Sequence, residues 1–445
     1  MIKLIAFDNK TTLVLEKTKK LSLYLCGPTL YDHAHIGNLR GPILFDVLIK
    51  LLKTEGYDYR YYQNITDIDD KIIFQAQQKN QSEKTLTDYY FIHYQKLFQD
   101  INMLIPEFIK VTDFIPEIIN FITKLLQKKA AYETDDGVYF DTQKIQYFHS
   151  ASTKPKHLSN DLNKINLNKK HFADFALWKK KTSGKKWASP WGVGRPGWHT
   201  ECVGLIDKII GQTLDVHGGG NDLTFPHHFN EEIQFKTLYS QQPLAKFWLR
   251  NGFVIFAETK ISKSNPQMLN KFLTKDFIQK YSANVLRFLF YLSPYHQDIT
   301  LTDKLLTYSQ HLESKVTNIF IQTRFYWFLQ TKNTIYTLKE FDSKWWKKFL
   351  VCLKNNLNTT QALDVLIKII KKINLFFVKK TNNEAFVLVN TLKKCLDVLG
   401  IKIQLISWDQ QTLNEIKQWQ KHLETKNYVK ADCLRKILQQ KKVLV

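Results

Sequence analysis

The sequence is poor in cysteine, and its five thiols stand far apart in 445 residues. This usage excludes a disulfide-stapled secreted scaffold and fits a reducing compartment. Long apolar runs are also missing: no stretch approaches the ~20 residues that span a bilayer, and the N-terminus lacks the apolar run and cleavage site of a signal peptide. We therefore expect a cytoplasmic protein with no membrane partner.

Acidic residues are too few to balance the basic ones. Against 64 Lys and Arg stand 41 Asp and Glu, which gives a formal net charge of +23. Residues 301–445 carry +14 of this excess, from 25 basic and 11 acidic residues. A basic tail suits a polyanionic partner, and RNA or DNA fits better than an acidic protein. Only seven of the basic residues are arginine, so part of the excess reflects a general lysine bias.

What is present is enough apolar sequence, 44% of the chain, to exclude global disorder. Residues 21–26 form a short apolar run that stops at Gly27-Pro28, which predicts a strand. Residues 41–52 repeat apolar side chains on one helical face, and 59–65 predict the next strand. Strand, helix and strand in this order predict a parallel sheet with a crevice at its carboxyl ends.

The later sequence predicts a split α/β domain followed by helices. Residues 150–186 are rich in Lys, Asn and Ser and indicate a basic, loopy insertion. Strand-like sequence returns near 213–217 and 252–256, and the apolar period is helical from about 275 almost to the end. The expected regions are a Rossmann-type parallel-sheet domain at 1–112 and 191–258, an insertion at 113–190, a loop region at 259–310, a helical bundle at 311–405, and a short segment at 406–445.

Two polar segments have residues that can bind phosphate. His35-Ile-Gly37-Asn38 lies between the first strand and helix, where free N–H groups, imidazole and amide donors attract phosphate and Gly37 lets a flat ring approach. Lys260-Ile-Ser-Lys263-Ser264 places two lysines beside hydroxyls that can hold a polyphosphate. Taken separately, an ordinary turn and a solvated surface loop account for these segments.

A third group of residues could bind a metal ion. Cys26, Cys202, His227 and Glu231 make a plausible four-ligand zinc set. If Pro226 begins a helix, His227 and Glu231 are four apart and share one face. The four come from three distant segments, unlike a zinc finger. The alternative is two buried thiols and a helix with polar N-terminal residues.

In combination, these segments resemble the cysteinyl-tRNA synthetase family of class I aminoacyl-tRNA synthetases. The two phosphate segments resemble the paired class I signatures, and four further blocks resemble that family in its order: 25–32, 64–71, 197–202 and 217–228. The similarity covers roughly residues 20–300 in register and, more loosely, the helical tail. It implies ATP-dependent activation of L-cysteine to cysteinyl-adenylate and transfer to the 3′ end of tRNA(Cys).

The resemblance also implies a role for individual residues. One zinc ion would be held by Cys26, Cys202, His227 and Glu231 and would select the substrate's thiolate, because a serine hydroxyl is a poor ligand for zinc. The residues implied to contact cysteine are Gly27, Thr66, Trp198 and His217. Those implied to bind ATP, with Mg²⁺, are His35, Gly37, Asn38, Gly218, Asp222, Lys260 and Lys263, of which His35, Lys260 and Lys263 would be catalytic.

The same resemblance gives the later regions their expected roles. Residues 191–258 would include the zinc site, 259–310 a KMSKS-type loop and stem-contact region, 311–405 a tRNA-binding bundle, and 406–445 a short anticodon-end segment. The family is usually monomeric, and we expect a monomer. The sequence departs from the usual family pattern at Asn38, Phe229 and Asn265-Pro266.

Two other functions are compatible with parts of this pattern. A paralogous ligase that joins activated cysteine to an amino sugar, as in the mycothiol pathway, shares the zinc, ATP and cysteine sites but needs no basic tail. An RNA-binding protein with a structural zinc and no catalysis needs neither the two lysines nor the His35 segment. The remaining cysteines match no ligand of the family and lie in helical apolar patterns, which predicts that they pack in the core; they are Cys352, Cys395 and Cys433.

Overall fold

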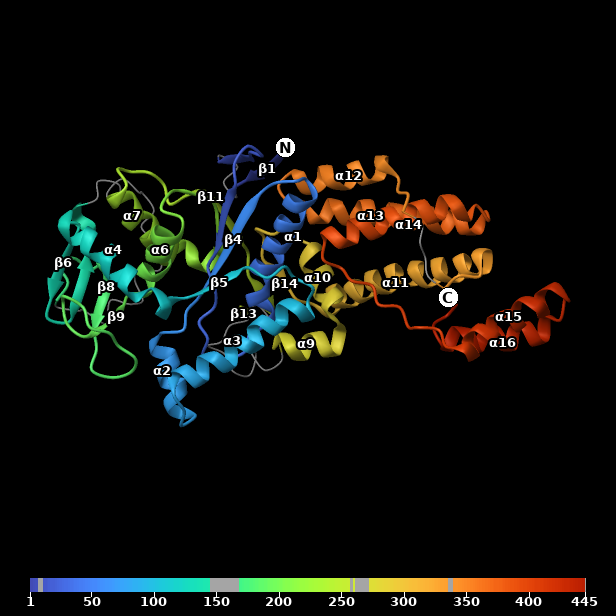
Figure 1. The fold of residues 1–445 in the computed structure, drawn as a ribbon, viewed down its shortest axis with the longest axis horizontal. Helices are drawn as coiled ribbons and strands as arrows, with labels where there is room; N and C mark the ends of the chain where they lie inside the picture. Colours follow the sequence, from blue (N-terminus) through green and yellow to red (C-terminus); the bar gives the residue numbers. More distant parts are fainter. Residues whose placement is uncertain (7–10, 145–167, 257–258, 261–271, 335–338, 445) are drawn as a thin grey trace.

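The computed structural model describes residues 1–6, 11–144, 168–256, 259–260, 272–334 and 339–444 (Figure 1). Five parallel strands form its central sheet in the order β11-β10-β3-β4-β5. Their bounds are Leu21–Leu25 for β3, Tyr59–Ile65 for β4, Glu107–Lys110 for β5, Leu214–Gly220 for β10 and Ala245–Asn251 for β11. The predicted parallel sheet is confirmed.

The predicted βαβ unit lies at the centre of this sheet. A short 3-10 turn, Ile36–Leu39, leads from β3 into helix α1, Arg40–Thr54, and the chain returns as β4. Strand β3 pairs with β4 on one side and with β10 on the other. The chain therefore leaves β3 toward one edge of the sheet and later returns to the opposite side. Such a reversal of strand order opens a crevice at the carboxyl ends, between β3 and β10.

A second core lies at one end of the long axis, where helices pack on a small antiparallel sheet (Figure 1). The sheet order is β6 (Ala131–Thr134), β7 (Gly137–Phe140), β8 (Phe175–Lys180) and β9 (Gly194–Pro196). The helices are α4 (Ile115–Gln127), α6 (Trp198–Ile209) and α7 (Phe229–Leu238).

Strand β8 corrects the prediction that residues 150–186 are loopy throughout. Residues 145–167 lie outside the described part, but β8 pairs with both β7 and β9. Leu177 and Trp178 are fully buried, whereas Lys179 and Lys180 remain half-buried at its end. The lysines made the segment look solvated, and the apolar residues before them decide its structure.

The strand predicted near residues 252–256 is confirmed, and it belongs to a third, three-stranded sheet. That strand exists as β12, Val254–Phe256, but it pairs with β13, Thr259–Lys260, and β14, Ile299–Thr300, instead of joining the central sheet. The place beside β10 belongs to β11, which the sequence analysis missed.

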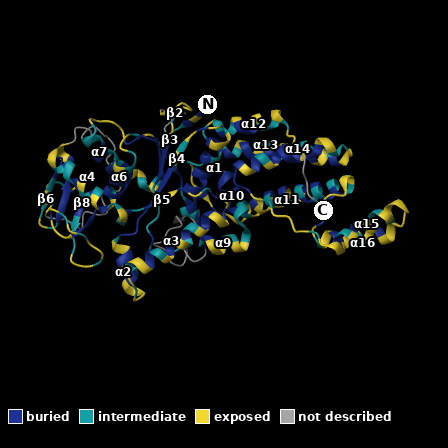
Figure 2. Ribbon diagram, viewed as in Figure 1, coloured by how far each residue is buried: buried dark blue, intermediate teal, exposed yellow. Residues whose placement is uncertain are grey.

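The predicted helical tail is confirmed apart from β14. Its helices are α9 (Thr274–Tyr281), α10 (Ala283–Tyr291), α11 (Asp303–Thr331), α12 (Ser343–Lys354), α13 (Thr359–Val378), α14 (Asn382–Val398), α15 (Gln410–Glu424) and α16 (Tyr428–Gln440). The largest core is continuous from β1, Ile2–Ile5, through α1 to α14 (Figure 2). No helix of the described residues is long and apolar enough to cross a membrane.

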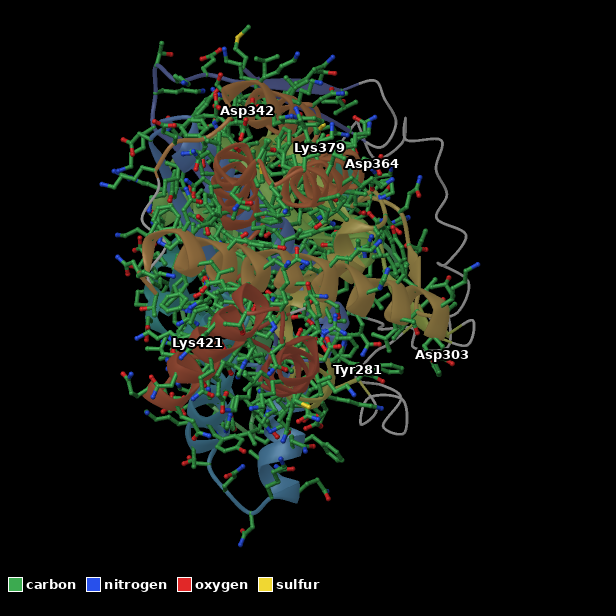
Figure 3. The ribbon with its side chains drawn as sticks, turned by 90° about the vertical axis from the view of Figure 1, so that its right-hand side faces the viewer. Tyr281, Asp303, Asp342, Asp364, Lys379 and Lys421 are labelled. Atoms are coloured by element: carbon green, nitrogen blue, oxygen red, sulfur yellow. The ribbon has the colours of Figure 1, made fainter. Side chains whose placement is uncertain are left out.

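Buried polar contacts join the sheet domain to the helical tail. The Arg287 guanidinium of α10 is fully buried, lies 2.7 Å from the Asp46 carboxylate of α1, and donates to the carbonyl of Leu399 after α14. Helices α15 and α16 pack against the end of α11 through a small separate core that contains Phe325, Ile416 and Leu438. Figure 3 faces this end of the molecule.

The three helical cysteines differ in burial. Cys395 is buried in the main core, as predicted, and Cys352 is half-buried against it. Cys433 is exposed on α16, so the prediction that it packs in a core is wrong. It lies on the outer face of a two-helix hairpin, and a hairpin can bury only the residues that face its partner.

Candidate metal and nucleotide site

Thiol, imidazole and carboxylate groups meet at the crevice between β3 and β10. Cys26 directly follows β3, and its backbone N–H donates to Gly218 of β10 over 2.9 Å. Cys202 comes from the second turn of α6, and His227 and Glu231 come from the turn before α7 and its first turn. The structure thus brings together all four residues that the sequence proposed as metal ligands.

The distances between these donors suit a metal ion of zinc's size. Cys26 Sγ lies 3.9 Å from Cys202 Sγ, 3.7 Å from His227 Nε2 and 3.8 Å from Glu231 Oε1. Tetrahedral zinc with bonds of about 2.0–2.3 Å needs donor pairs about 3.3–3.8 Å apart. His227 Nε2 and Glu231 Oε1 are closer, at 2.7 Å, because they form an ion pair. The buried Glu231 Oε2 has no hydrogen-bond partner among the described residues, which also fits a metal ligand.

A second set of donors overlaps the first. Cys26 and Glu231 also group with His217 of β10 and with His228, and all four donor atoms lie within 4.8 Å of one another. Cys26 Sγ is 3.3 Å from His217 Nε2 and 3.6 Å from His228 Nε2. The sequence analysis assigned His217 to the amino-acid pocket and missed His228. The only signal for His228 was its position beside His227.

The charges within this cluster are strongly coupled. Burial lowers the pKa of His227, but the charges of Glu231 and Cys202 outweigh burial and raise that pKa to about 10. Burial raises the pKa of Glu231, yet His227 outweighs it and lowers the carboxyl pKa. A hydrogen bond from Cys26 lowers the pKa of the Cys202 thiol, whereas burial raises the pKa of Cys26. Cys202 and Glu231 are thus shifted toward their anionic forms, which bind cations, whereas Cys26 and His227 have to lose a proton before they can bind a metal.

The neighbouring imidazoles are neutral at pH 7. Burial lowers the pKa of His217 to about 4 and that of His228 well below its usual value. Both rings pack against Trp248 of β11, with centroids 4.4 Å and 4.7 Å from the indole. A neutral imidazole can bind a metal without first losing a proton.

The residues predicted to contact cysteine surround the donor cluster. Trp198, 38% exposed, stacks on His227 with ring centroids 4.3 Å apart. Thr66 is buried just after β4, where it accepts a hydrogen bond from Asn64 over 3.3 Å. Gly27 lets the backbone pass close to β4, since a Cβ there would lie 1.7 Å from the Asn64 carbonyl oxygen. Gly27 and Thr66 thus lie just after β3 and β4, and Trp198 and His217 contact members of the donor cluster.

The predicted nucleotide residues begin at the turn before α1. His35 is the N-cap of the Ile36–Leu39 turn, and its backbone N–H donates to Asn38 Oδ1 over 3.1 Å. The Asn38 side chain thus completes a capping box, which is a structural role for this residue. Gly37 lies directly beneath the His35 ring, which leaves 3.0 Å for a Cβ.

The other predicted nucleotide residues lie across the crevice or outside the described part. Gly218 leaves the space that Phe45 fills, since a Cβ there would lie 2.2 Å from that ring. Asp222 lies in a 3-10 turn, Asn221–Leu223, just after β10. Lys260 ends β13, and only its backbone is described. Lys263 and Asn265-Pro266 lie outside the described residues.

Residues 12–311 match the family described as tRNA synthetases class I (C) catalytic domain. The Cysteine--tRNA ligase of Mesoplasma florum is 36% identical over 434 residues, which cover 95% of this chain and 96% of the relative. That of Mycoplasma mycoides subsp. mycoides SC is 38% identical over 440 residues, covering 97% and 98%. This chain belongs to the cysteine–tRNA ligase family.

Solved class I synthetases share the fold. A methionyl-tRNA synthetase of Mycobacterium tuberculosis with bound methionyl-adenylate superposes with a TM-score of 0.62 at 10% identity, over 89% of this chain and 93% of that one. A putative arginyl-tRNA synthetase of Campylobacter jejuni gives 0.56 at 12% identity, over 87% and 94%. The split parallel sheet and the helical region after it are therefore those of a class I synthetase.

Phe229, the first residue of α7, directly follows His228 of the donor cluster. Its ring contacts Phe225 with centroids 5.8 Å apart and packs against the second core. The side chain that follows the two histidines is therefore apolar and partly buried. Arg250 of β11 approaches from the other side, with Nε 3.4 Å from His228 Nδ1.

Proposed function

We propose that this protein uses ATP to activate L-cysteine as cysteinyl-adenylate and then transfers it to the 3′ end of tRNA(Cys). Membership of the cysteine–tRNA ligase family over nearly the whole chain is the observation that carries the proposal. The cluster of two thiols, imidazoles and a carboxylate supports it further, because such groups can hold a metal ion that binds the thiolate of cysteine.

Zinc is the metal that best fits this cluster. Two thiolates and an imidazole are soft or borderline ligands, which select zinc over magnesium or calcium. We assign the ion to Cys26, Cys202, His227 and Glu231, because this set contains both thiols. When bound, zinc would supply a soft Lewis acid for the substrate thiolate. Trp198 and Thr66 would then shape the space around the amino acid, with His217 as a neutral imidazole close to the thiol.

Adenylate formation depends on charge stabilisation. The substrate carboxylate attacks the α-phosphorus, and pyrophosphate leaves with its charge spread over several oxygens. We assign His35 and Asn38, in the turn that leads into α1, as hydrogen-bond donors to ATP. Gly37, Gly218 and Asp222 would lie around the nucleotide. We assign Lys260 and Lys263 to the departing pyrophosphate, and Mg²⁺, when bound, would neutralise part of its negative charge.

The basic helical tail would bind tRNA. The proposed divisions are a catalytic domain at 1–112 and 191–258, a connective insertion at 113–190, a stem-contact region at 259–310, a tRNA-binding bundle at 311–405 and an anticodon-end segment at 406–445. Lys379, at the end of α13, and Lys421, in α15, add positive charge at the end of the molecule seen in Figure 3. We propose a monomer that works in the cytoplasm.

ATP–pyrophosphate exchange, measured with each of the twenty amino acids, tests the activation step. Exchange should depend on cysteine and be weak with serine. Adding tRNA(Cys) should then yield cysteinyl-tRNA. Exchange without transfer to tRNA would point instead to a ligase with another acceptor, and no exchange at all would contradict the proposal.

A further inference from the structure

Arg40, the first residue of α1, joins two distant parts of the chain. It directly follows the Ile36–Leu39 turn, which contains Asn38, and is only 3% exposed. Its Nη1 donates to the carbonyl of Phe253 over 2.8 Å, and its Nη2 donates to Gln297 over 2.5 Å and to Pro294 over 3.3 Å. Burial lowers the pKa of its guanidinium to about 10. All three acceptors are backbone carbonyls. The Arg40 side chain therefore fixes the position of the main chain at Phe253, Pro294 and Gln297.

Those carbonyls belong to residues that come just before β12 and β14 of the three-stranded sheet. Phe253 immediately precedes β12, and its carbonyl also accepts from the N–H of Ile299, the first residue of β14. The N–H of Phe253 donates to Asp298 Oδ1 over 2.7 Å. Gly252 makes the crossing possible, since a Cβ there would lie 2.3 Å from the Gln297 carbonyl oxygen. The starts of β12 and β14 are thus held as one unit against α1.

The far side of the same region is tied to the same turn. The N–H of Ile36 donates to the Phe272 carbonyl over 3.0 Å, and the N–H of Thr274 donates to the Ala34 carbonyl over 2.9 Å. The described residues on both sides of 261–271 are therefore anchored to residues 34–40. On the Phe272 side these hydrogen bonds join backbone to backbone, and on the Phe253 side they come from the Arg40 side chain.

We propose that Arg40 is a positioning residue for adenylate formation, which holds β12 and its partner β13 in register with the His35–Asn38 turn. This inference rests on the proposed function, because β13 ends at Lys260. Lysine cannot replace the guanidinium here: its single ammonium cannot span the Phe253 and Gln297 carbonyls as a planar fork does. Losing the fork would let the strand pair shift relative to the turn and weaken contacts that matter most in the transition state.

Cysteine-dependent ATP–pyrophosphate exchange by Arg40→Lys tests this role. We expect the exchange kcat to fall roughly tenfold or more, while the KM for cysteine stays within about twofold, because the residues assigned to bind cysteine lie on elements other than β12, β13 and β14. The matched control is Arg287→Lys, which changes an equally buried, carbonyl-bonded guanidinium that lies away from the three-stranded sheet. It should lower the melting temperature and leave the exchange kcat near wild type.

A second variant separates positioning from general stability. Arg40→Ala leaves a cavity, and millimolar guanidinium ion should restore part of its exchange kcat, without the same effect on Arg287→Ala. An unchanged kcat in Arg40→Lys, or an equal loss of kcat in Arg287→Lys, would overturn the Arg40 role while the proposed function stands. Wild-type protein without any exchange would overturn both. If Arg40→Ala does not fold, Arg40→Lys and its Arg287→Lys control decide alone.

Discussion

The carboxylate of Glu231 lies 2.7 Å from Nε2 of His227, and both side chains are buried. The pair holds a proton that a metal ion would have to displace, because the pKa of His227 is raised to about 10. In the apoprotein, protonated His227 therefore supplies positive charge next to Glu231, at the place where the cation would bind.

Zinc binding by the apoprotein should release protons and tighten as pH rises. Between about pH 6 and 9 the His227 imidazole is still protonated, and a proton and zinc compete for its Nε2. Because the proton concentration falls as pH rises, zinc should bind more tightly at higher pH. Calorimetry in buffers of different ionisation enthalpy measures the released protons directly. A zinc affinity that is flat over this range would show that His227 is not a ligand.

Cys202→Ser should weaken zinc and cysteine binding together. A serine oxygen is a poor ligand for zinc, and we expect metal affinity to fall roughly tenfold or more. ATP binding should change little, since Cys202 lies in α6, away from the His35 turn. Zinc content, cysteine binding and ATP binding are measured side by side, with Cys352→Ser as the control. Full zinc retention in Cys202→Ser would favour the overlapping donor set with His217 and His228.

Removing the metal should abolish the preference for cysteine over serine. The two amino acids differ by one atom, and a pocket that measures size alone separates such a pair poorly. Exchange rates with both substrates are compared before chelation, after chelation and after zinc is restored, with circular dichroism to confirm that the fold persists. Strong cysteine preference in folded, metal-free protein would rule out zinc as the selector.

Charge reversal on α13 should weaken tRNA binding. Lys371, Lys379 and Lys380 are exposed, whereas Lys372 packs over the Trp345 ring and is best left intact. The triple Lys→Glu variant should raise the KM for tRNA and flatten its salt dependence, because fewer counterions are released on binding.

Exchange without tRNA should be unchanged in this variant. The matched control reverses two exposed lysines of α3 (Glu83–Asp100), Lys84 and Lys96. If the tRNA KM does not respond to the α13 change, or responds equally to the α3 change, these lysines reflect only the lysine-rich composition.

Lys50 should make stability depend on alkaline pH. Burial lowers its folded pKa to about 8, below the 10.5 of the unfolded chain. Between these values the unfolded state binds more protons, so stability should rise with pH in this window.

Lys50→Met should lack this rise while Asp46 keeps its partner Arg287. The stability difference, wild type minus variant, should therefore grow by about 1 to 3 kcal/mol from pH 7 to pH 10. Urea unfolding at several pH values measures it. A difference that does not change with pH would mean that Lys50 titrates normally.

The central fold was predictable because its signals are local. The apolar residues of β3, α1 and β4 each follow a pattern that fits one type of secondary structure, a strand for β3 and β4 and a helix for α1. Strand β11 also alternates, with Phe247 and Leu249 buried and Lys246 exposed, but it is an edge strand with a polar face and was missed. Strand β8 was hidden by the lysines at its end.

The donor cluster was predictable only through family resemblance. Cys26 follows β3, Cys202 lies in α6, and His227 and Glu231 lie in the turn before α7 and in its first turn. The spacing of these residues in the sequence does not predict that the segments lie close together in the fold. His228 shows why: consecutive residues of a regular helix point about 100° apart, yet His227 and His228 are both buried in the irregular turn Thr224–His228. No periodicity predicts two such neighbours.

The continuous core has a consequence for how the chain is made. Helix α1 packs against α14, and Arg287 completes its contacts with the Leu399 carbonyl only when that residue is available. During synthesis, domains fold as units once their residues have emerged. Here the first strands have to wait for almost the entire polypeptide. A ribosome that stalls near residue 311 would therefore release a nascent chain with its apolar α1 face uncovered, a substrate for chaperones instead of a working half-enzyme.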